Sequence, residues 1–259
     1  MIESLILGLA ALRMEILSDF NYTVKENIKY ATHERNVGDL YLTSKKNAGI
    51  IYVVHGGSWS GRDKTDMNYI CKSLASHGYN VFNINYRLAP ENKHPAPVED
   101  LSLAINFISK KYKDDINISN SGIWGYSAGA HIGLLYALTH SDKVKAFVGG
   151  GGPYDFLWWP KSPIITPYMG YSMDSNMQGW LEASPVHYIH RNAPQMFLYH
   201  GGGDELVEHS QMTHFAAQAK LKGVDVRTFT VSDYGHVKTF LTGREAIVKG
   251  LEFIQQNVN

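Results

Sequence analysis

Residues 121–140 read SGIWGYSAGAHIGLLYALTH, a stretch in which a serine lies between two glycines where one sequence pattern changes into another. The apolar run before Ser127 predicts a short buried strand, and the apolar-rich run after it predicts a helix. A G-x-S-x-G pattern alone occurs by chance in roughly one chain in ten of this length, because glycine makes up about 7% of residues. The strand–turn–helix context makes the pattern far more specific, since a tight turn there exposes the serine hydroxyl as a potential nucleophile.

Strands and helices alternate along most of the chain. Short apolar runs predict strands within 49–57, 79–86, 121–127, 143–152, 193–202 and 224–231. Helical spacing predicts helices within 66–78, 97–112, 128–140, 210–223 and 243–256. This order indicates a mostly parallel sheet with helices on both faces. The earlier segments 21–31 and 36–44 alternate polar and apolar residues, so we expect an antiparallel hairpin at one edge of that sheet.

Residues 153–190 interrupt this alternation. They show no clean period and hold five aromatic residues between Tyr154 and Tyr168. A long irregular insertion in a compact domain is usually functional. Two interpretations stay open: a small cap over a site, or an edge excursion with its own small core. We therefore expect one domain over residues 1–259, with a cap-like insertion at about 153–190.

Composition narrows the class of protein. The chain has 259 residues, 44% of them apolar, which is enough to bury a substantial core. Its 24 basic and 24 acidic side chains balance, and no basic stripe indicates binding to nucleic acid. The single cysteine, Cys71, excludes an internal disulfide, and we expect it to be a buried helix residue. No H-E-x-x-H motif or pair of C-x-x-C motifs is present, so we expect no metal site.

The N-terminal apolar run, residues 5–12, resembles the core of a signal peptide. However, the residues before it carry Glu3 and no Lys or Arg, whereas a signal normally begins with positive charge. The run is also too short to span a bilayer. We favour an amphipathic N-terminal helix and a soluble cytoplasmic protein that does not bind membranes, with secretion through an atypical signal left as the alternative.

A serine nucleophile needs a base to take its proton and an acid group to orient that base. Asp204 follows the predicted strand within 193–202, and His236 follows the next strand, giving the chain order serine, acid, histidine that this architecture uses. Glu205 and Asp233 compete for the role of the acid. Among the other histidines, His209 and His214 are expected to be solvated helix residues and His200 a structural residue at a strand end, while His187 and His190 lie in the insertion.

The stretch HGGSW, residues 55–59, follows the first buried strand and predicts an oxyanion hole. Glycines there leave backbone N–H groups unobstructed, and we expect Gly57, Ser58 and Ala128 to donate to a tetrahedral oxyanion. The run GGGG at 149–152 is not a dinucleotide-binding loop, because Pro153 and an aromatic run follow it instead of a helix.

Together these motifs resemble the α/β-hydrolase superfamily, most closely its hormone-sensitive-lipase-like esterases and its kynurenine formamidase branch. The resemblance covers roughly residues 22–256 and rests on HGGSW, YRLAPENKHPAPVEDL (86–101), GYSAGAH, HGGGDELV and YGHVKTF. Lipase-like members usually have glycine where this chain has Ser58, which hints at the formamidase branch. These branches include esterases, lipases, formamidases and carbohydrate deacylases, so the motifs do not fix the substrate.

We expect a carboxylesterase-type serine hydrolase that needs no cofactor and cleaves small esters of short acyl chains through an acyl-enzyme. Ser127 would be the nucleophile, His236 the base and Asp204 the acid. The small-molecule substrate, an ester or an amide, would contact aromatic residues; the candidates are Trp59, Phe156, Trp158, Trp159 and Trp180. Two alternatives remain: an arylformamidase acting on N-formylkynurenine, and a non-catalytic receptor that keeps the pocket to bind a small ligand.

Overall fold

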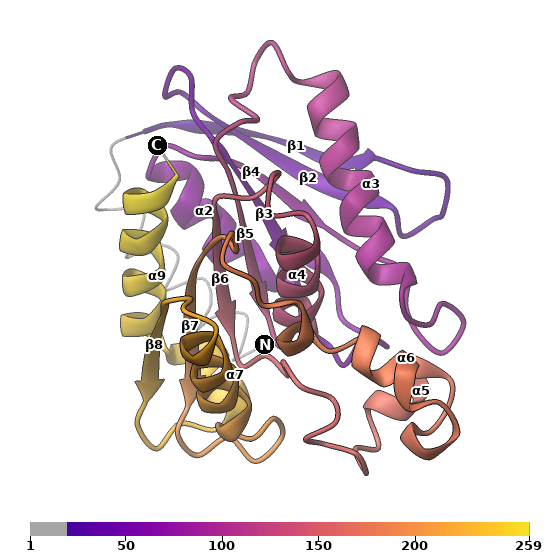
Figure 1. The fold of residues 1–259 in the computed structure, drawn as a ribbon. Coiled ribbons are helices and arrows are strands. Elements are labelled where there is room, and N and C mark those ends of the chain that lie inside the picture. The colour runs from indigo at the N-terminus through magenta and orange to yellow at the C-terminus, as the bar shows by residue number, and fades with distance from the viewer. Residues whose placement is uncertain (1–19, 259) are drawn as a thin grey trace.

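An eight-stranded sheet runs through the molecule in the strand order β1-β2-β4-β3-β5-β6-β7-β8 (Figure 1). The computed structural model describes residues 20–258. The strands are β1 (Tyr22–Lys29), β2 (Val37–Thr43), β3 (Ile50–Val54), β4 (Asn80–Ile84), β5 (Ser121–Tyr126), β6 (Ala146–Gly150), β7 (Gln195–Gly201) and β8 (Val226–Val231). From β4 to β8 all neighbours are parallel, whereas the pairs β1–β2 and β2–β4 at one edge are antiparallel. The predicted sheet and its edge hairpin are confirmed.

Helices cover both faces of this sheet. The helices are α2 (Asn68–Ser76), α3 (Ala96–Lys111), α4 (Ala128–Thr139), α5 (Ile165–Met169), α6 (Met177–Glu182), α7 (Ser210–Leu221), α8 (His236–Thr242) and α9 (Arg244–Asn257), with short 3₁₀ turns η1 (Lys64–Met67), η2 (Met173–Ser175) and η3 (Pro185–Tyr188). Residues of α3, α4 and α7 share one buried cluster with the sheet, and residues of α2, α8 and α9 share the other. Strands β3 to β6 are buried throughout, which explains their unbroken apolar runs.

The turn from β5 into α4 depends on two glycines. A Cβ on Gly129 would overlap the carbonyl group of Val54, and one on Gly125 would overlap the carbonyl of Gly129. Because neither glycine carries a Cβ, the first turn of α4 packs directly against the ends of β3 and β5. This close approach fixes where the intervening residue, Ser127, projects.

Residues 153–190 hold α5, η2, α6 and η3, and Figure 1 shows α5 and α6 to one side, below α4. Four of their large aromatic side chains, Tyr154, Phe156, Tyr168 and Trp180, are fully buried and belong to the same cluster as α3 and α4. The insertion therefore extends the main core on that face instead of forming a separate one. Its role as a cap stays a prediction.

Two further predictions from the sequence concern Cys71 and the N-terminal segment. Cys71 lies in α2 and is buried, as expected, and burial raises the pKa of its thiol well above the ordinary value. The predicted N-terminal helix lies outside the described residues. Within residues 20–258, no helix is long and apolar enough to cross a membrane.

Candidate active site

Ser127 occupies a strained position between β5 and α4. Its φ and ψ are 53° and −122°, a backbone conformation that a residue with a side chain adopts only at an energetic cost. Neighbouring hydrogen bonds hold it there: Ser127 N donates to Gly150 O at 2.7 Å, and Ser127 O accepts from His131 N at 3.1 Å. The predicted sharp turn at the carboxyl end of a central strand is confirmed.

Asp204, in the loop after β7, and His236, at the start of α8, form a short hydrogen bond. His236 Nδ1 lies 2.7 Å from Asp204 Oδ2. The other carboxylate oxygen, Oδ1, accepts from Leu206 N at 3.0 Å and from Val207 N at 2.9 Å, so both oxygens of Asp204 are held. The competing acids Glu205 and Asp233 are exposed. The geometry therefore pairs His236 with the carboxylate that the sequence favoured.

His236 is the first residue of α8, and two contacts bring it to the end of β5. Tyr126, which directly precedes Ser127, donates its hydroxyl to His236 O at 2.6 Å. A Cβ built on Gly151, just beyond β6, would lie 3.0 Å from His236 Cε1. The imidazole thus lies over the carboxyl ends of the central strands, where ligands bind in open parallel sheets.

A second histidine contacts Asp204, although the sequence indicated only a structural role for it. His200 Nε2 lies 2.8 Å from Val207 O and 3.2 Å from Asp204 Oδ2, and the ring is fully buried. A backbone carbonyl only accepts hydrogen bonds, so Nε2 must carry the proton and can also donate to the carboxylate. The sequence signal was the position of His200 near the end of β7, four residues before Asp204.

Burial and hydrogen bonding act on Asp204 in opposite directions. Burial raises the pKa of its carboxyl group, but the hydrogen bonds from His200 and His236 outweigh burial, and the pKa lies well below its ordinary value. Asp204 is therefore a carboxylate at neutral pH. As an anion it fixes the His236 tautomer with the proton on Nδ1, which leaves Nε2 as the basic nitrogen.

One cavity of about 240 Å³ brings four of the site candidates together. Ser127, His236, Gly57 and Ser58 all line it. Its remaining wall is formed by Gly56, Tyr126, the ion pair Arg62–Asp66 and the apolar side chains Leu206, Val237, Phe240 and Leu241. The apolar part comes mainly from α8 and the loop after β7, two elements in which the sequence pattern predicted no substrate contacts.

The five aromatic candidates for substrate contact do not line this cavity. Trp59, Phe156 and Trp180 are at most 1% exposed, and Trp59 stacks on Tyr168 with the ring centroids 4.4 Å apart. Trp158 is 54% exposed and packs edge-on against His214, while Trp159 is half-buried. The expectation that they form the pocket wall is wrong: Trp59, Phe156 and Trp180 fill the core beneath the site, and Trp158 faces solvent.

Trp59 instead anchors the turn that contains it. Its Nε1 donates to His131 Nδ1 at 3.2 Å, and His131 Nε2 donates to the carbonyl of Ala183 at 2.8 Å. Burial lowers the pKa of His131 to about 3, so the imidazole is neutral and accepts from Trp59. This chain of bonds joins the HGGSW turn, the start of α4 and the insertion.

The candidate oxyanion turn presents its backbone toward the cavity. Gly57 and Ser58 have φ of 111° and 53°. Within the described part of the chain, their N–H groups donate to no protein acceptor. Ala128 is the first residue of α4, so its N–H has no acceptor inside the helix. Three N–H groups are therefore available near Ser127.

Comparisons with known proteins identify a family and several relatives that this chain resembles. The model of the BD-FAE family matches residues 39–219. "Probable carboxylic ester hydrolase LipM" of Mycobacterium tuberculosis is 31% identical over 205 residues, which cover 70% of this chain and 47% of LipM. The kynurenine formamidase of Meyerozyma guilliermondii is 36% identical over 177 residues, which cover 61% of this chain and 64% of the relative. The chain thus spans less than two thirds of the length of either curated relative.

Among solved structures, an esterase of the bacterial hormone-sensitive lipase family superimposes with a TM-score of 0.76 at 19% identity. The match covers 99% of this chain and 98% of that one. At this identity the likeness concerns the fold alone. The fold is that of the α/β-hydrolases, as the motifs implied.

Proposed function

Since the chain belongs to the BD-FAE family, we propose that it is a serine hydrolase that cleaves carboxylic esters of short acyl chains. The observation that carries the proposal is that Ser127 and His236 line one cavity, with His236 hydrogen-bonded to a buried carboxylate. The relative LipM, which is named a probable carboxylic ester hydrolase, supports the same reaction class.

In the proposed reaction, Ser127 Oγ attacks the acyl carbonyl while His236 Nε2 takes the hydroxyl proton. Asp204 accepts from His236 Nδ1 and stabilises the imidazolium that forms. The N–H groups of Gly57, Ser58 and Ala128 donate to the oxyanion of the tetrahedral intermediate. His236 then returns the proton to the leaving alcohol, and water releases the acyl group in a second round with His236 again as base.

Substitution of the serine tests the mechanism. We expect Ser127→Ala to lower the turnover of p-nitrophenyl acetate on the order of 10⁴-fold or more, because the covalent route is lost. Circular dichroism should show an unchanged fold. A purified variant that retains more than about a tenth of wild-type turnover would rule out Ser127 as the nucleophile.

A second candidate function is hydrolysis of an aryl formamide. The 36% identity to a kynurenine formamidase and the H-G-G-x-W form of the turn at 55–59 favour it. The same site would act, with an amine as the leaving group. Comparing kcat/KM for N-formylkynurenine and for p-nitrophenyl acetate and butyrate decides between the two, whereas a non-catalytic receptor would turn over none of them.

A further inference from the structure

The turn between β3 and η1, residues 55–62, is unusually strained. Gly57, Ser58, Trp59 and Arg62 have φ of 111°, 53°, 58° and 73°, and three of these four residues carry side chains. Such a backbone persists only where the surrounding structure over-determines it. Trp59 is fixed from the inside by His131 and Tyr168. The two ends of the turn need a separate restraint.

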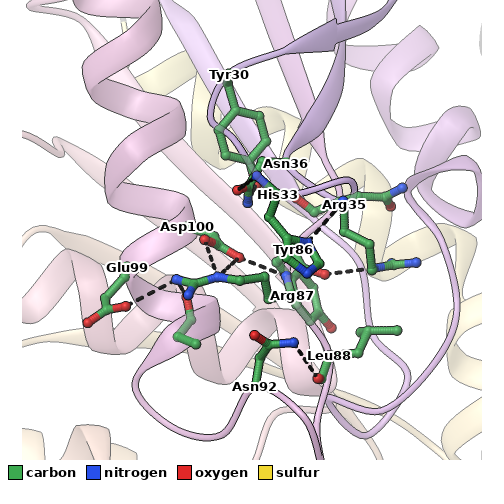
Figure 2. Close-up of polar contacts among 12 residues, drawn as sticks. Tyr30, His33, Arg35, Asn36, Tyr86, Arg87, Leu88, Asn92, Glu99 and Asp100 are labelled. Carbon is green, nitrogen blue, oxygen red and sulfur yellow. Dashed lines mark hydrogen bonds and ion pairs between the residues drawn. The ribbon is translucent and has the colours of Figure 1, made fainter.

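Arg35, in the loop between β1 and β2, supplies contacts at both ends. Its Nη2 donates to the carbonyl of Arg62 at 3.0 Å and lies 3.5 Å from His55 Nε2. Its Nε donates to the carbonyl of Tyr86, just beyond β4, at 2.8 Å. Figure 2 shows Arg35 directed at this carbonyl, while the adjacent Arg87 turns away toward Asp100 and Glu99.

The imidazole of His55 can accept a hydrogen bond from Arg35. Its Nδ1 lies 2.6 Å from the carbonyl of Gly56, so Nδ1 carries the proton and Nε2 can accept. Burial lowers the pKa of His55 to about 4, which keeps the ring neutral at pH 7. The ring stacks on Tyr86 with centroids 4.3 Å apart, and the Tyr86 hydroxyl donates to His55 O at 3.1 Å. Arg35 and Tyr86 thus hold the same end of the turn from two sides.

Arg35 is itself fixed by its own loop. Its N–H donates to His33 Nδ1 at 3.1 Å, and His33 N donates to Asn36 Oδ1 at 3.1 Å. Tyr30 closes the loop onto the sheet by donating its hydroxyl to the carbonyl of Asn85 at 2.5 Å. The guanidinium is therefore presented from a defined position, and it does not line the cavity.

We propose that Arg35 is a positioning residue that holds the oxyanion turn in its strained conformation by joining Arg62 O, His55 and Tyr86 O. The proposal rests on the proposed hydrolase function, since it concerns the donors Gly57 and Ser58. It predicts that Arg35 acts on the transition state through the geometry of the turn and makes no contact with substrate.

Removal of the guanidinium should lower kcat and leave KM nearly unchanged. We expect a loss of about 10- to 100-fold in kcat for Arg35→Ala with p-nitrophenyl acetate, because small misplacements of preorganised donors are costly. Arg35→Lys keeps the charge but loses the planar fork whose Nε and Nη2 reach Tyr86 O and Arg62 O, so it should recover only part of the rate. Guanidinium chloride at millimolar concentration should raise the kcat of the Arg35→Ala variant several-fold.

A readout that needs no catalysis accompanies the rates. The N–H groups of Ser60 and Gly61 both donate to Gly57 O at 3.0 Å, so hydrogen exchange in peptides covering 56–62 reports the order of the turn. We expect faster exchange there in Arg35→Ala and slower exchange on addition of guanidinium. Arg227→Ala is the matched control, because Arg227 also bonds a neighbour, Gln256, but lies on β8.

The outcomes distinguish the proposed hydrolase function from the proposed role of Arg35. If the wild-type protein hydrolyses neither esters nor N-formylkynurenine, the proposed function fails, while the exchange experiment still tests the role of Arg35. If Arg35→Ala is folded and keeps both wild-type kcat and wild-type exchange at 56–62, Arg35 does not position the turn. A loss of rate that guanidinium fails to restore, without faster exchange at 56–62, would also overturn the proposal.

Discussion

At the scale of single residues, the order of motifs along the chain predicted the candidate triad, whereas other contacts of the site became visible only in the structure. The order Ser127, Asp204, His236 was readable because each residue follows a predicted strand and parallel strands end at one edge. His200 and Arg35 were missed because they act through neighbours: one on Asp204 across the end of β7, the other on a turn that begins 20 residues later. The aromatic candidates were wrongly assigned to the pocket wall, because the sequence around a tryptophan does not say whether its ring faces a cavity or the core.

The identity of the acid gives the prediction at this scale. We expect Asp204→Asn to lower kcat on the order of 10⁴-fold, since an amide can donate to His236 and so favour the wrong tautomer. Glu205→Gln should stay within about twofold of wild type, because Glu205 is exposed and His236 is bonded to Asp204 instead. Steady-state kinetics on both purified variants, with p-nitrophenyl acetate as substrate, measures the difference. Equal losses, or a greater loss at Glu205, would reassign the acid.

At the scale of elements, the sequence predicted the strands, the edge hairpin and the tight turn at Ser127 between β5 and α4, which is called the elbow below. It did not predict α8, the seven-residue helix that begins at His236 and supplies part of the cavity wall. The run HVKTFLT is too short for a helical period to stand out, and it is held in place by tertiary contacts such as the bond from Tyr69 to the carbonyl of Phe240. Short helices that pack on a site are thus the elements that a sequence pattern fails to reveal.

The elbow predicts a strong effect of one methyl group. In Gly129→Ala the added Cβ overlaps the Val54 carbonyl, so α4 must shift away from β3. We expect a loss of about 2 kcal/mol in the free energy of unfolding and a fall of roughly 5 °C in Tm. Gly61→Ala is the control for stability, because a Cβ there meets no atom within 4 Å. Thermal melts followed by circular dichroism compare the two, and equal Tm values would mean that the elbow is not tightly packed.

At the scale of the whole molecule, the cavity suggests the size of the substrate. Its volume of about 240 Å³ is below the range of roughly 300–1,000 Å³ that is typical of pockets for drug-sized ligands. We expect the hydrolysis rates of p-nitrophenyl esters from two to sixteen carbons to peak at about four carbons or fewer, because longer chains leave apolar surface in water. Rates measured below the solubility limit of each ester give the profile. A maximum at ten carbons or more, or a jump in rate when the substrate forms an emulsion, would favour a lipase instead.

The interleaved strand order also affects when the sheet and the site can form during synthesis. Strand β3 lies between β4 and β5, and its pairing with β5 joins Ile50 to Ser121, so the centre of the sheet closes only after a long stretch of chain has been made. Non-local pairing of this kind slows folding. Ribosomes add about 5–20 residues per second, and His236 is translated 109 residues after Ser127, as 236 − 127 gives, so the serine waits roughly 5–20 seconds for its base. For that interval a nascent chain carries the proposed nucleophile without the proposed base, so the proposed hydrolase is inactive until His236 has been made.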